Sequence, residues 1–253
     1  MTRNLWTREE MILALSLYFR LPFGRLNHAT PEVKNLARLI GRTDNSVALR
    51  LVNYAACDPY ILSTGRHGMA SGAKTCQPIW DEYANDKERL FFEAKLIEAR
   101  LLERSIEEVL SITPTELEGK EREAVVRQRV NQEAFHDMVF GNYNYRCAIT
   151  GIDIPSMLAA GHIIPWSKSV EHRLDPENGL CLSPLYHEAF DQGFISLDDN
   201  YRIILAPKLA KYSSRDYYAQ HFAALDHRPI LLPDEHCPNP RYLEWHRDVV
   251  FNK

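Results

Sequence analysis

Apolar and polar positions in the first sixty residues recur with the period of an α-helix, in three separate runs. Residues 7–19 open with a threonine and a glutamate spaced as a capping box, and a mostly apolar stretch follows. Residues 30–40 begin at a Thr-Pro pair and stop at Gly41, and residues 43–54 form the third run. Helices joined by a short turn that contains glycine predict a helix-turn-helix within residues 1–60.

The middle of the chain has a different pattern. Residues 57–80 are rich in glycine, serine and other small side chains, which predicts a loop. Residues 81–110 return to a helical period, with an apolar face that packs inside the protomer or, alternatively, forms a homodimer interface. Residues 113–120 predict a linker. We therefore assign residues 61–123 to a loop and a helical connector.

Residues 124–253 begin with a helical pattern to about residue 140 and then break into short strand-like pieces and turns. One strand-like piece carries His162, a second covers residues 179–183, and Pro184 suits the first turn of a helix. The fold class predicted for the chain is therefore α+β, with a helical N-terminal module, a helical connector and a mixed C-terminal domain.

Composition excludes several classes of protein. No run approaches the roughly 18 apolar residues of a membrane span, and the N-terminus lacks the apolar core of a signal peptide. Five scattered cysteines without a CxxC pair argue against a disulfide framework and against a four-cysteine zinc site. These features predict a cytoplasmic protein with no membrane partner.

The net charge of −4 argues against a nucleic-acid partner only when the chain is taken as a whole. Residues 1–75 sum to +5, residues 76–123 to −6 and residues 124–253 to −3. Local potential, rather than whole-chain charge, steers a protein towards a polyanion. Whole-chain charge therefore decides little, and residues 1–75 are the locally basic part of the chain.

Candidate chemistry is concentrated in residues 158–198. His187 and Asp191 are four positions apart in a predicted helix, so both side chains project from one face. A nitrogen and an oxygen donor suit one divalent cation, Mg²⁺ or Mn²⁺, while Ni²⁺ and Zn²⁺ are also compatible. His162 would approach from the facing strand, where a neutral imidazole deprotonates a water for attack on phosphorus.

Three motifs carry a family resemblance: GHIIPW at residues 161–166, ENGL at residues 177–180 and LYHEAFDQG at residues 185–193. Together they resemble the HNH (His-Asn-His) nucleases, which are built as a two-stranded ribbon and a helix around one metal. Upstream and C-terminal stretches are similar to the bacterial restriction-type branch, so the resemblance covers about residues 127–250.

The resemblance implies a role for each of these residues. His162 is the general base, and His187 and Asp191 are metal ligands. Asn178 holds the loop that positions His162 through bonds from its amide to the backbone. A lone histidine on an apolar strand is usually a core residue, and we expect His246 to be such a residue, in a C-terminal helix.

One position departs from the family pattern. Many HNH nucleases have an aspartate or a histidine directly before the base as a further metal ligand, whereas this chain has Gly161. Asp153 or water is then left to complete the metal shell.

The N-terminal runs resemble the Myb/SANT-like and helix-turn-helix DNA-binding modules, on the segments at residues 6–10, 36–43 and 46–51. The resemblance implies that the third helix lies in the major groove. The alternative is a helical module that only packs against the nuclease or a second subunit. The implied DNA contacts, to bases or phosphates, are Arg42, Asn45, Ser46 and Arg50.

Taken together, the sequence predicts a metal-dependent HNH endonuclease in residues 124–253 that cuts double-stranded DNA in restriction or defence. Hydrolysis leaves 5′-phosphate and 3′-hydroxyl ends, as the resemblance implies. One alternative is a non-catalytic DNA-binding regulator on an HNH scaffold, which only Gly161 favours. Another is a defence-system effector that a ligand or partner protein activates.

Overall fold

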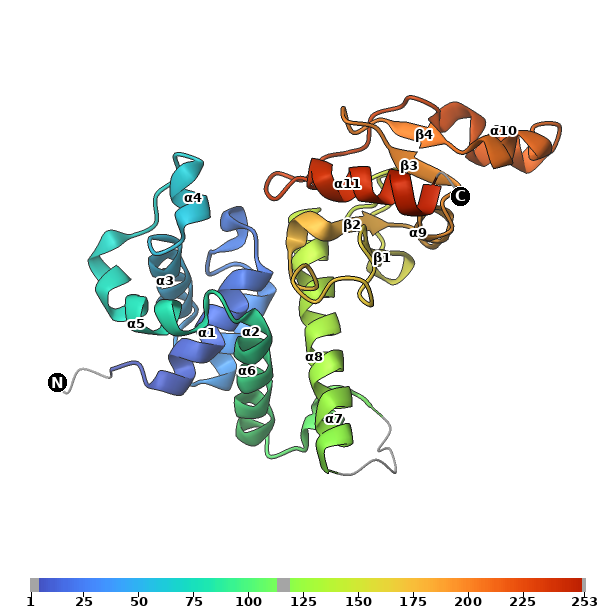
Figure 1. The fold of residues 1–253 in the computed structure, drawn as a ribbon. Coiled ribbons are helices and arrows are strands. Elements are labelled where there is room, and N and C mark those ends of the chain that lie inside the picture. The colour runs from blue at the N-terminus through green and yellow to red at the C-terminus, as the bar shows by residue number, and fades with distance from the viewer. Residues whose placement is uncertain (1–4, 113–118, 252–253) are drawn as a thin grey trace. The chain divides into compact units, whose positions relative to one another are not determined.

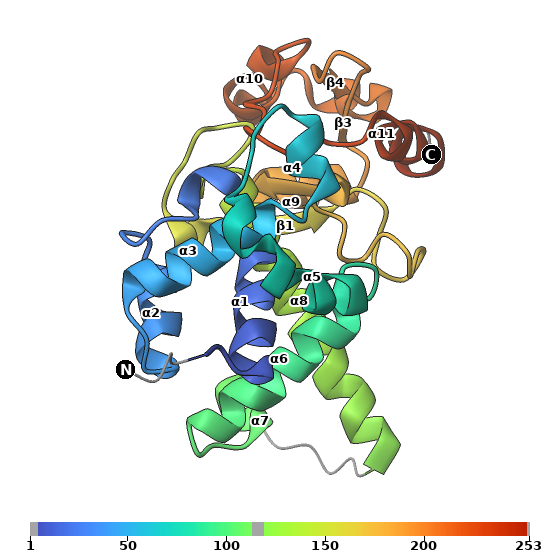
Figure 2. The same cartoon turned by 90° about the vertical axis from the view of Figure 1, so that its left-hand side faces the viewer.

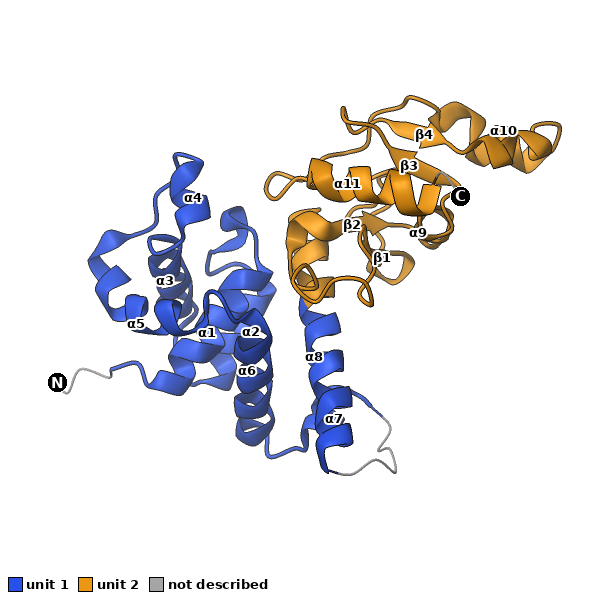
Figure 3. Cartoon of the chain, in the orientation of Figure 1, with its two compact units in different colours: residues 1–134 blue, residues 135–253 orange. Residues whose placement is uncertain are grey.

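A computed structural model describes residues 5–112 and 119–251 of the chain. It divides into two compact units, residues 1–134 and residues 135–253 (Figure 3). The division falls inside one long helix, α8 (Gly119–Asn142). The domain boundaries predicted at residues 60 and 123 therefore do not coincide with the units. Most of the predicted linker at 113–120 lies outside the described residues.

Unit 1 is built from helices (Figure 1). The three predicted N-terminal helices are present, and the predicted capping box at the start of the first one is formed. The helices of the unit are α1 (Arg8–Arg20), α2 (Pro31–Leu39), α3 (Asp44–Ala55), α4 (Pro59–Ser63), α5 (Ala73–Tyr83), α6 (Lys87–Leu101), α7 (Ile106–Val109) and the first part of α8, with short 3₁₀ turns at Phe23–Arg25 and Ala70–Gly72.

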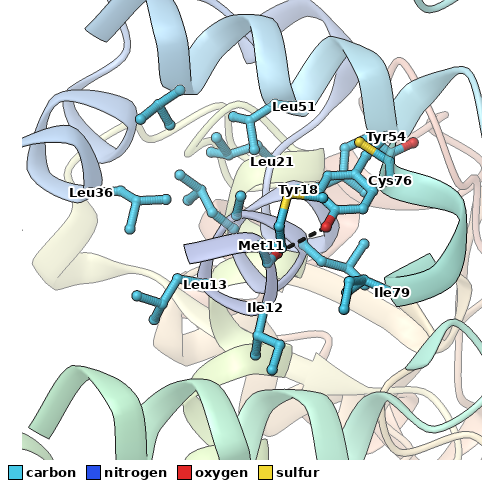
Figure 4. Packing of buried hydrophobic residues seen from close by; sticks show 14 of the residues in the cluster. Met11, Ile12, Leu13, Tyr18, Leu21, Leu36, Leu51, Tyr54, Cys76 and Ile79 are labelled. Atoms are coloured by element: carbon cyan, nitrogen blue, oxygen red, sulfur yellow. Dashed lines mark hydrogen bonds between the residues drawn. The ribbon is translucent and has the colours of Figure 1, made fainter. Parts of the chain in front are cut away.

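Helix α1 is the centre of unit 1. Every residue from Met11 to Tyr18 is buried, which is the pattern of a helix that is covered on all sides. Helices α2, α3, α5 and α6 all contact it (Figure 2). The core is closed by residues from α5, such as Cys76 and Ile79, beside Tyr54, whose hydroxyl donates to the Met11 carbonyl (Figure 4). Residues 1–60 thus share one core with the helices that follow.

The loop predicted for residues 57–80 is wrong, because α4 and most of α5 lie there. Its glycines allow close packing. A Cβ atom on Gly68 would lie 2.2 Å from the amide nitrogen of Ala56, and one on Gly72 would lie 2.1 Å from the side-chain nitrogen of Asn53. Only glycine lets this segment pack directly onto the end of α3.

The single helix predicted over residues 81–110 is interrupted. Asp86 caps the start of α6 by accepting from the Arg89 amide, and a capping box of Ser105 and Glu108 starts α7. The buried face of α6 belongs to the core of unit 1, so this apolar face packs inside the protomer, the first of the two predicted possibilities.

Unit 2 combines the end of α8 with two small sheets and short helices. The first sheet pairs β1 (Ala159–His162) with β2 (Gly179–Leu182) antiparallel, with His162 opposite Gly179. A Cβ on Gly179 would lie 2.3 Å from the Val139 side chain, so this glycine lets α8 pack against the ribbon. The other elements are α9 (Pro184–Asp191), β3 (Ile195–Leu197) paired with β4 (Ile203–Leu205), α10 (Asp216–His221), α11 (Pro240–His246) and a π-helical turn at Arg247–Phe251.

The predicted ribbon followed by a helix is confirmed by β1, β2 and α9. Among the described residues, no helix is both long enough and apolar enough to cross a membrane.

Candidate active site

A cleft in unit 2 brings the predicted catalytic histidine and metal ligands together. Side chains from β1, the segment after it, α9 and the C-terminal helix line it. These residues are Ala160, His162, Ile163, Pro165, Trp166, His187, Asp191, His246 and Val250.

His162, the last residue of β1, is fixed by contacts on several sides. Its ring stacks on Phe135 of α8 with the centroids 3.5 Å apart, and Trp166 meets it edge-on at 5.6 Å. Its Nε2 atom lies 3.1 Å from the carbonyl oxygen of Arg173. Because a carbonyl only accepts, Nε2 is the donor and carries the proton. In the neutral ring, Nδ1 therefore keeps its lone pair.

The surroundings of His162 keep it neutral near pH 7. Burial lowers the pKa of the imidazole to about 4, and the positive charges of Arg173 and His187 act in the same direction. The hydrogen bond to the Arg173 carbonyl opposes this shift. A general base has to be unprotonated before it takes a proton, and His162 meets that requirement.

Asn178 holds the loop that follows β1 closed. Its side chain is 1% exposed, and its Oδ1 accepts from the Ile164 amide at 2.8 Å. Its Nδ2 donates to the carbonyl oxygens of Ile164 and His172 at 3.0 and 3.1 Å. This geometry is the amide-to-backbone clamp expected of Asn178. It fixes both ends of the segment from Ile164 to His172, which Arg173 directly follows.

His187 and Asp191 lie side by side on α9, with Nε2 of the histidine 3.7 Å from Oδ2 of the aspartate. Burial raises the pKa of the Asp191 carboxyl, and the neighbouring His187 opposes that shift. Both side chains are partly exposed at the cleft. The four-residue spacing has thus placed both donors on one face, as predicted.

The lack of space beside the His187 ring explains why residue 161 is a glycine. A Cβ at this position would lie 2.8 Å from Cδ2 of the His187 ring, so the imidazole occupies the space that a side chain would need. A further ligand at residue 161 is therefore incompatible with His187 in this position. The glycine therefore makes room for the His187 ring.

The donor set fits a divalent cation that is held by few protein groups. Among the residues that the structure describes, no group of three or more His, Cys, Asp or Glu side chains is placed to hold a metal. Asp153 is exposed and does not line the cleft. One imidazole and one carboxylate at an open cleft leave positions for water and substrate oxygens, as suits Mg²⁺ or Mn²⁺.

The predicted DNA contacts in unit 1 are placed differently from the expectation. Arg42 is 9% exposed along its side chain and donates to both carboxylate oxygens of Glu10, each at 2.8 Å. Arg50 donates to the Cys76 sulfur at 3.5 Å. Both guanidinium groups lie against the ring of Trp6, with Cζ 4.6 and 4.7 Å from its centroid.

Both guanidinium groups thus have partners within unit 1 that are far away in the sequence. Their contact with DNA stays a prediction. Asn45 is exposed near the start of α3, and Ser46 is half-buried. Asn45 and Ser46 thus remain accessible at the end of α3 that the module would present to DNA.

Three residues around His162 had not been singled out from the sequence. Phe135 belongs to a helix whose apolar pattern gave no sign of a stacking role. Trp166 is the last residue of the GHIIPW motif, and that position is the available signal. Arg173 lies in a polar loop, where an arginine is ordinarily a solvated residue, and only the folded loop places it here.

His246 is structural, as expected. It is 1% exposed on α11, its Nε2 donates to the Phe190 carbonyl at 3.0 Å, and its Nδ1 accepts from the Ser196 hydroxyl at 2.8 Å. Its ring stacks on Phe190 at 3.7 Å. It joins α11 to α9 and β3, and so supports the helix that carries the candidate ligands.

We expect stability to depend on pH through His246. Burial lowers the pKa of His246 to about 4 in the folded protein, against an ordinary value of about 6.5. Between these values the unfolded chain binds a proton that the folded chain does not. The stability associated with the neutral ring is therefore complete above pH 6.5 and is lost as the pH falls towards 4. At pH 5 the loss is about 2 kcal/mol.

Urea unfolding at pH 7 and pH 5 in EDTA measures this effect. The drop in the free energy of unfolding between the two pH values should be smaller by about 2 kcal/mol in His246→Gln than in the wild type. His227→Gln, at a histidine with a 70% exposed side chain, is the matched control. Equal drops in His246→Gln and the wild type would contradict the prediction.

Comparisons with known proteins agree with the site. Residues 147–198 match the family model described as "HNH endonuclease". A solved structure titled "Modification dependent TagI restriction endonuclease" is similar at 20% identity and a TM-score of 0.33. The likeness covers 45% of this chain and 36% of that chain, so it spans about a third of that protein. No curated protein matches the chain.

The matched segment contains His162, Asn178, His187 and Asp191, the residues that form the cleft and its clamp. No finding confirms the predicted helix-turn-helix identity of the N-terminal helices. Residues 147–198, in unit 2, therefore form an HNH endonuclease domain.

Proposed function

We propose that this protein is a metal-dependent endonuclease that hydrolyses phosphodiester bonds of double-stranded DNA, in restriction or defence against foreign DNA. One observation carries the proposal. His162 is neutral, with its proton on Nε2, in the same cleft as the paired donors His187 and Asp191. A base and a cation site in one cleft meet the two main demands of phosphodiester hydrolysis.

In this mechanism the lone pair on Nδ1 of His162 accepts a proton from water as the water oxygen attacks phosphorus. The bond from phosphorus to the 3′ oxygen breaks, and this oxygen takes a proton from solvent, which leaves a 5′-phosphate and a 3′-hydroxyl. The Arg173 carbonyl holds the Nε2 proton and so keeps Nδ1 available. A divalent cation bound by His187 and Asp191 would neutralise charge on the phosphate and on the leaving oxygen.

Digestion of supercoiled plasmid DNA tests the proposal. Modified and unmodified plasmids are incubated with Mg²⁺, Mn²⁺, Ni²⁺ or Zn²⁺ in turn, and the ends are sequenced. We expect nicked or linear products with 5′-phosphate and 3′-hydroxyl ends, and none in EDTA. Absence of cleavage with every metal on every plasmid would contradict the function.

We also propose that unit 1 contacts the DNA through the outer surface of α2 and the start of α3. Lys34 and Arg38 are exposed one turn apart on α2. Neither forms an ion pair with a carboxylate in the part of the chain that the structure describes. Asn45 and Ser46 lie at the start of the next helix. Cations that are not neutralised inside the protein are available to replace counterions on a phosphate backbone.

The double variant Lys34→Ala/Arg38→Ala should bind duplex DNA more weakly in EDTA, with a salt slope smaller by about 2 in a log–log plot. Its matched control removes two exposed charges from the acidic segment at residues 76–123, in Arg104→Ala/Lys120→Ala. That control should leave the slope unchanged. An equal slope in the wild type and in Lys34→Ala/Arg38→Ala would instead support a packing role for these helices.

A further inference from the structure

The loop between β1 and β2 places Arg173 in contact with two residues that line the cleft, His162 and Trp166. Arg173 reaches His162 through its main chain, since its carbonyl accepts the Nε2 proton. Its side chain turns to Trp166, a residue that lines the cleft. The Arg173 Nε donates to the Trp166 carbonyl at 3.1 Å, and Cζ lies 4.9 Å from the centroid of the indole.

This arrangement leaves both Nη groups of the guanidinium without a hydrogen-bond acceptor in the described part of the chain. The bond from Nε and the stacking on Trp166 fix the plane of the group. Within residues 5–112 and 119–251, no carboxylate pairs with Arg173, and neither of its Nη atoms has a hydrogen-bond acceptor. A rigid guanidinium with two free Nη groups has the geometry that binds phosphate oxygens in pairs.

Among the described residues, the side chains that line the cleft lack a permanent positive charge to bind an anionic phosphodiester. His162 is neutral and Asp191 is an acid, so the side chains that line the cleft supply no permanent positive charge beside the catalytic base. Arg173 is close enough for its charge to act on the His162 ring. An anionic phosphodiester that is bound in reach of His162 therefore meets this guanidinium.

We propose that Arg173 is a phosphate-binding residue, whose Nη groups donate to a non-bridging oxygen of the phosphodiester that is cleaved. The inference rests on the proposed nuclease function and adds a substrate contact to it. Two parts of one residue then serve the site. The carbonyl orients His162, and the guanidinium binds the phosphodiester. The water that His162 deprotonates attacks this phosphodiester.

A purely structural role is the competing explanation, because the Nε bond also closes the loop from Trp166 to Arg173. Two substitutions separate these roles. Arg173→Gln keeps an N–H donor without the charge, and Arg173→Lys keeps the charge without the planar group. Any residue at this position retains the main-chain carbonyl that holds His162. Arg215→Gln is the control, at an exposed arginine next to α10.

Two measurements are made on the full chain. In EDTA, Arg173→Gln should weaken binding to a short DNA duplex about tenfold and reduce the salt slope by about 1. In plasmid cleavage it should raise KM by a similar factor, and Arg173→Lys should restore much of the loss. Arg215→Gln should match the wild type, and thermal unfolding should show that each variant is folded.

The opposite pattern would overturn the inference. If Arg173→Gln and Arg173→Lys lower kcat while duplex affinity, salt slope and KM stay at wild-type values, the side chain only closes the loop. The test also separates this inference from the proposed function. A wild type that cleaves no DNA defeats the nuclease proposal, whereas the binding measurement in EDTA still reports on Arg173.

Discussion

Replacing His162 by alanine is expected to lower the rate of DNA cleavage by about a thousandfold or more, while DNA binding in EDTA changes little. Among the described residues, His162 and His246 both line the cleft and both donate from Nε2 to a carbonyl. Only His162 keeps Nδ1 available, because Nδ1 of His246 accepts from the Ser196 hydroxyl. General-base catalysis contributes about 10²–10⁴ to a rate. Without the ring, the attacking water keeps its proton and phosphorus is attacked by a poorer nucleophile.

Plasmid cleavage with Mg²⁺ and with Mn²⁺ measures this effect, beside a duplex-binding titration. His227→Ala is the control, since His227 is an exposed histidine of the same unit. Because the ring also stacks on Phe135, circular dichroism and thermal unfolding have to show that the His162→Ala variant is folded. Full cleavage by a folded His162→Ala protein would falsify the assignment of the base.

The second large effect is expected at the cation site. Asp191→Ala and His187→Ala each remove one of the two protein donors that lie 3.7 Å apart on α9. With only one donor left, we expect Mn²⁺ affinity to fall about a hundredfold and cleavage to fall with it. Removing a residue that only supports a ligand already lowers metal affinity by about 10- to 100-fold, and removing a ligand itself should cost at least as much.

Isothermal titration with Mn²⁺ measures affinity without reference to cleavage. Glu188→Ala offers a matched control on the same helix, because Glu188 is exposed and bonds to Gln192 rather than lining the cleft. Its Mn²⁺ affinity should equal that of the wild type. Unchanged affinity in Asp191→Ala would mean that the cation is held elsewhere.

Local sequence determined those parts of the structure whose signals are short in range. The capping box at Thr7 and Glu10 formed because both partners lie within one helical turn. The spacing of His187 and Asp191 placed both on one face of α9, because the helical period decides which side chains share a face. The ribbon and helix that carry the candidate site could be predicted for the same reason.

Partners that are distant in sequence explain where prediction was wrong or incomplete. The segment at residues 57–80 looked like a loop because glycine is usually read as flexibility, whereas Gly68 and Gly72 allow close packing on α3. Arg42 is predicted to contact DNA, and the structure adds an ion pair with Glu10, 32 positions away, that the local sequence does not indicate. The local sequence of either segment does not indicate which distant residues will pack against it in the folded protein.

The sequence by itself therefore predicted the first three helices, the ribbon with its helix, and the candidate groups of the site, since motif and period are local properties. The tertiary structure decided the protonated nitrogen of His162, through the Arg173 carbonyl. It also decided the need for a glycine at residue 161, through the position of the His187 ring. Proton placement, burial and steric room depend on atoms that only folding brings together, and in this protein they convert a set of candidate residues into a candidate active site.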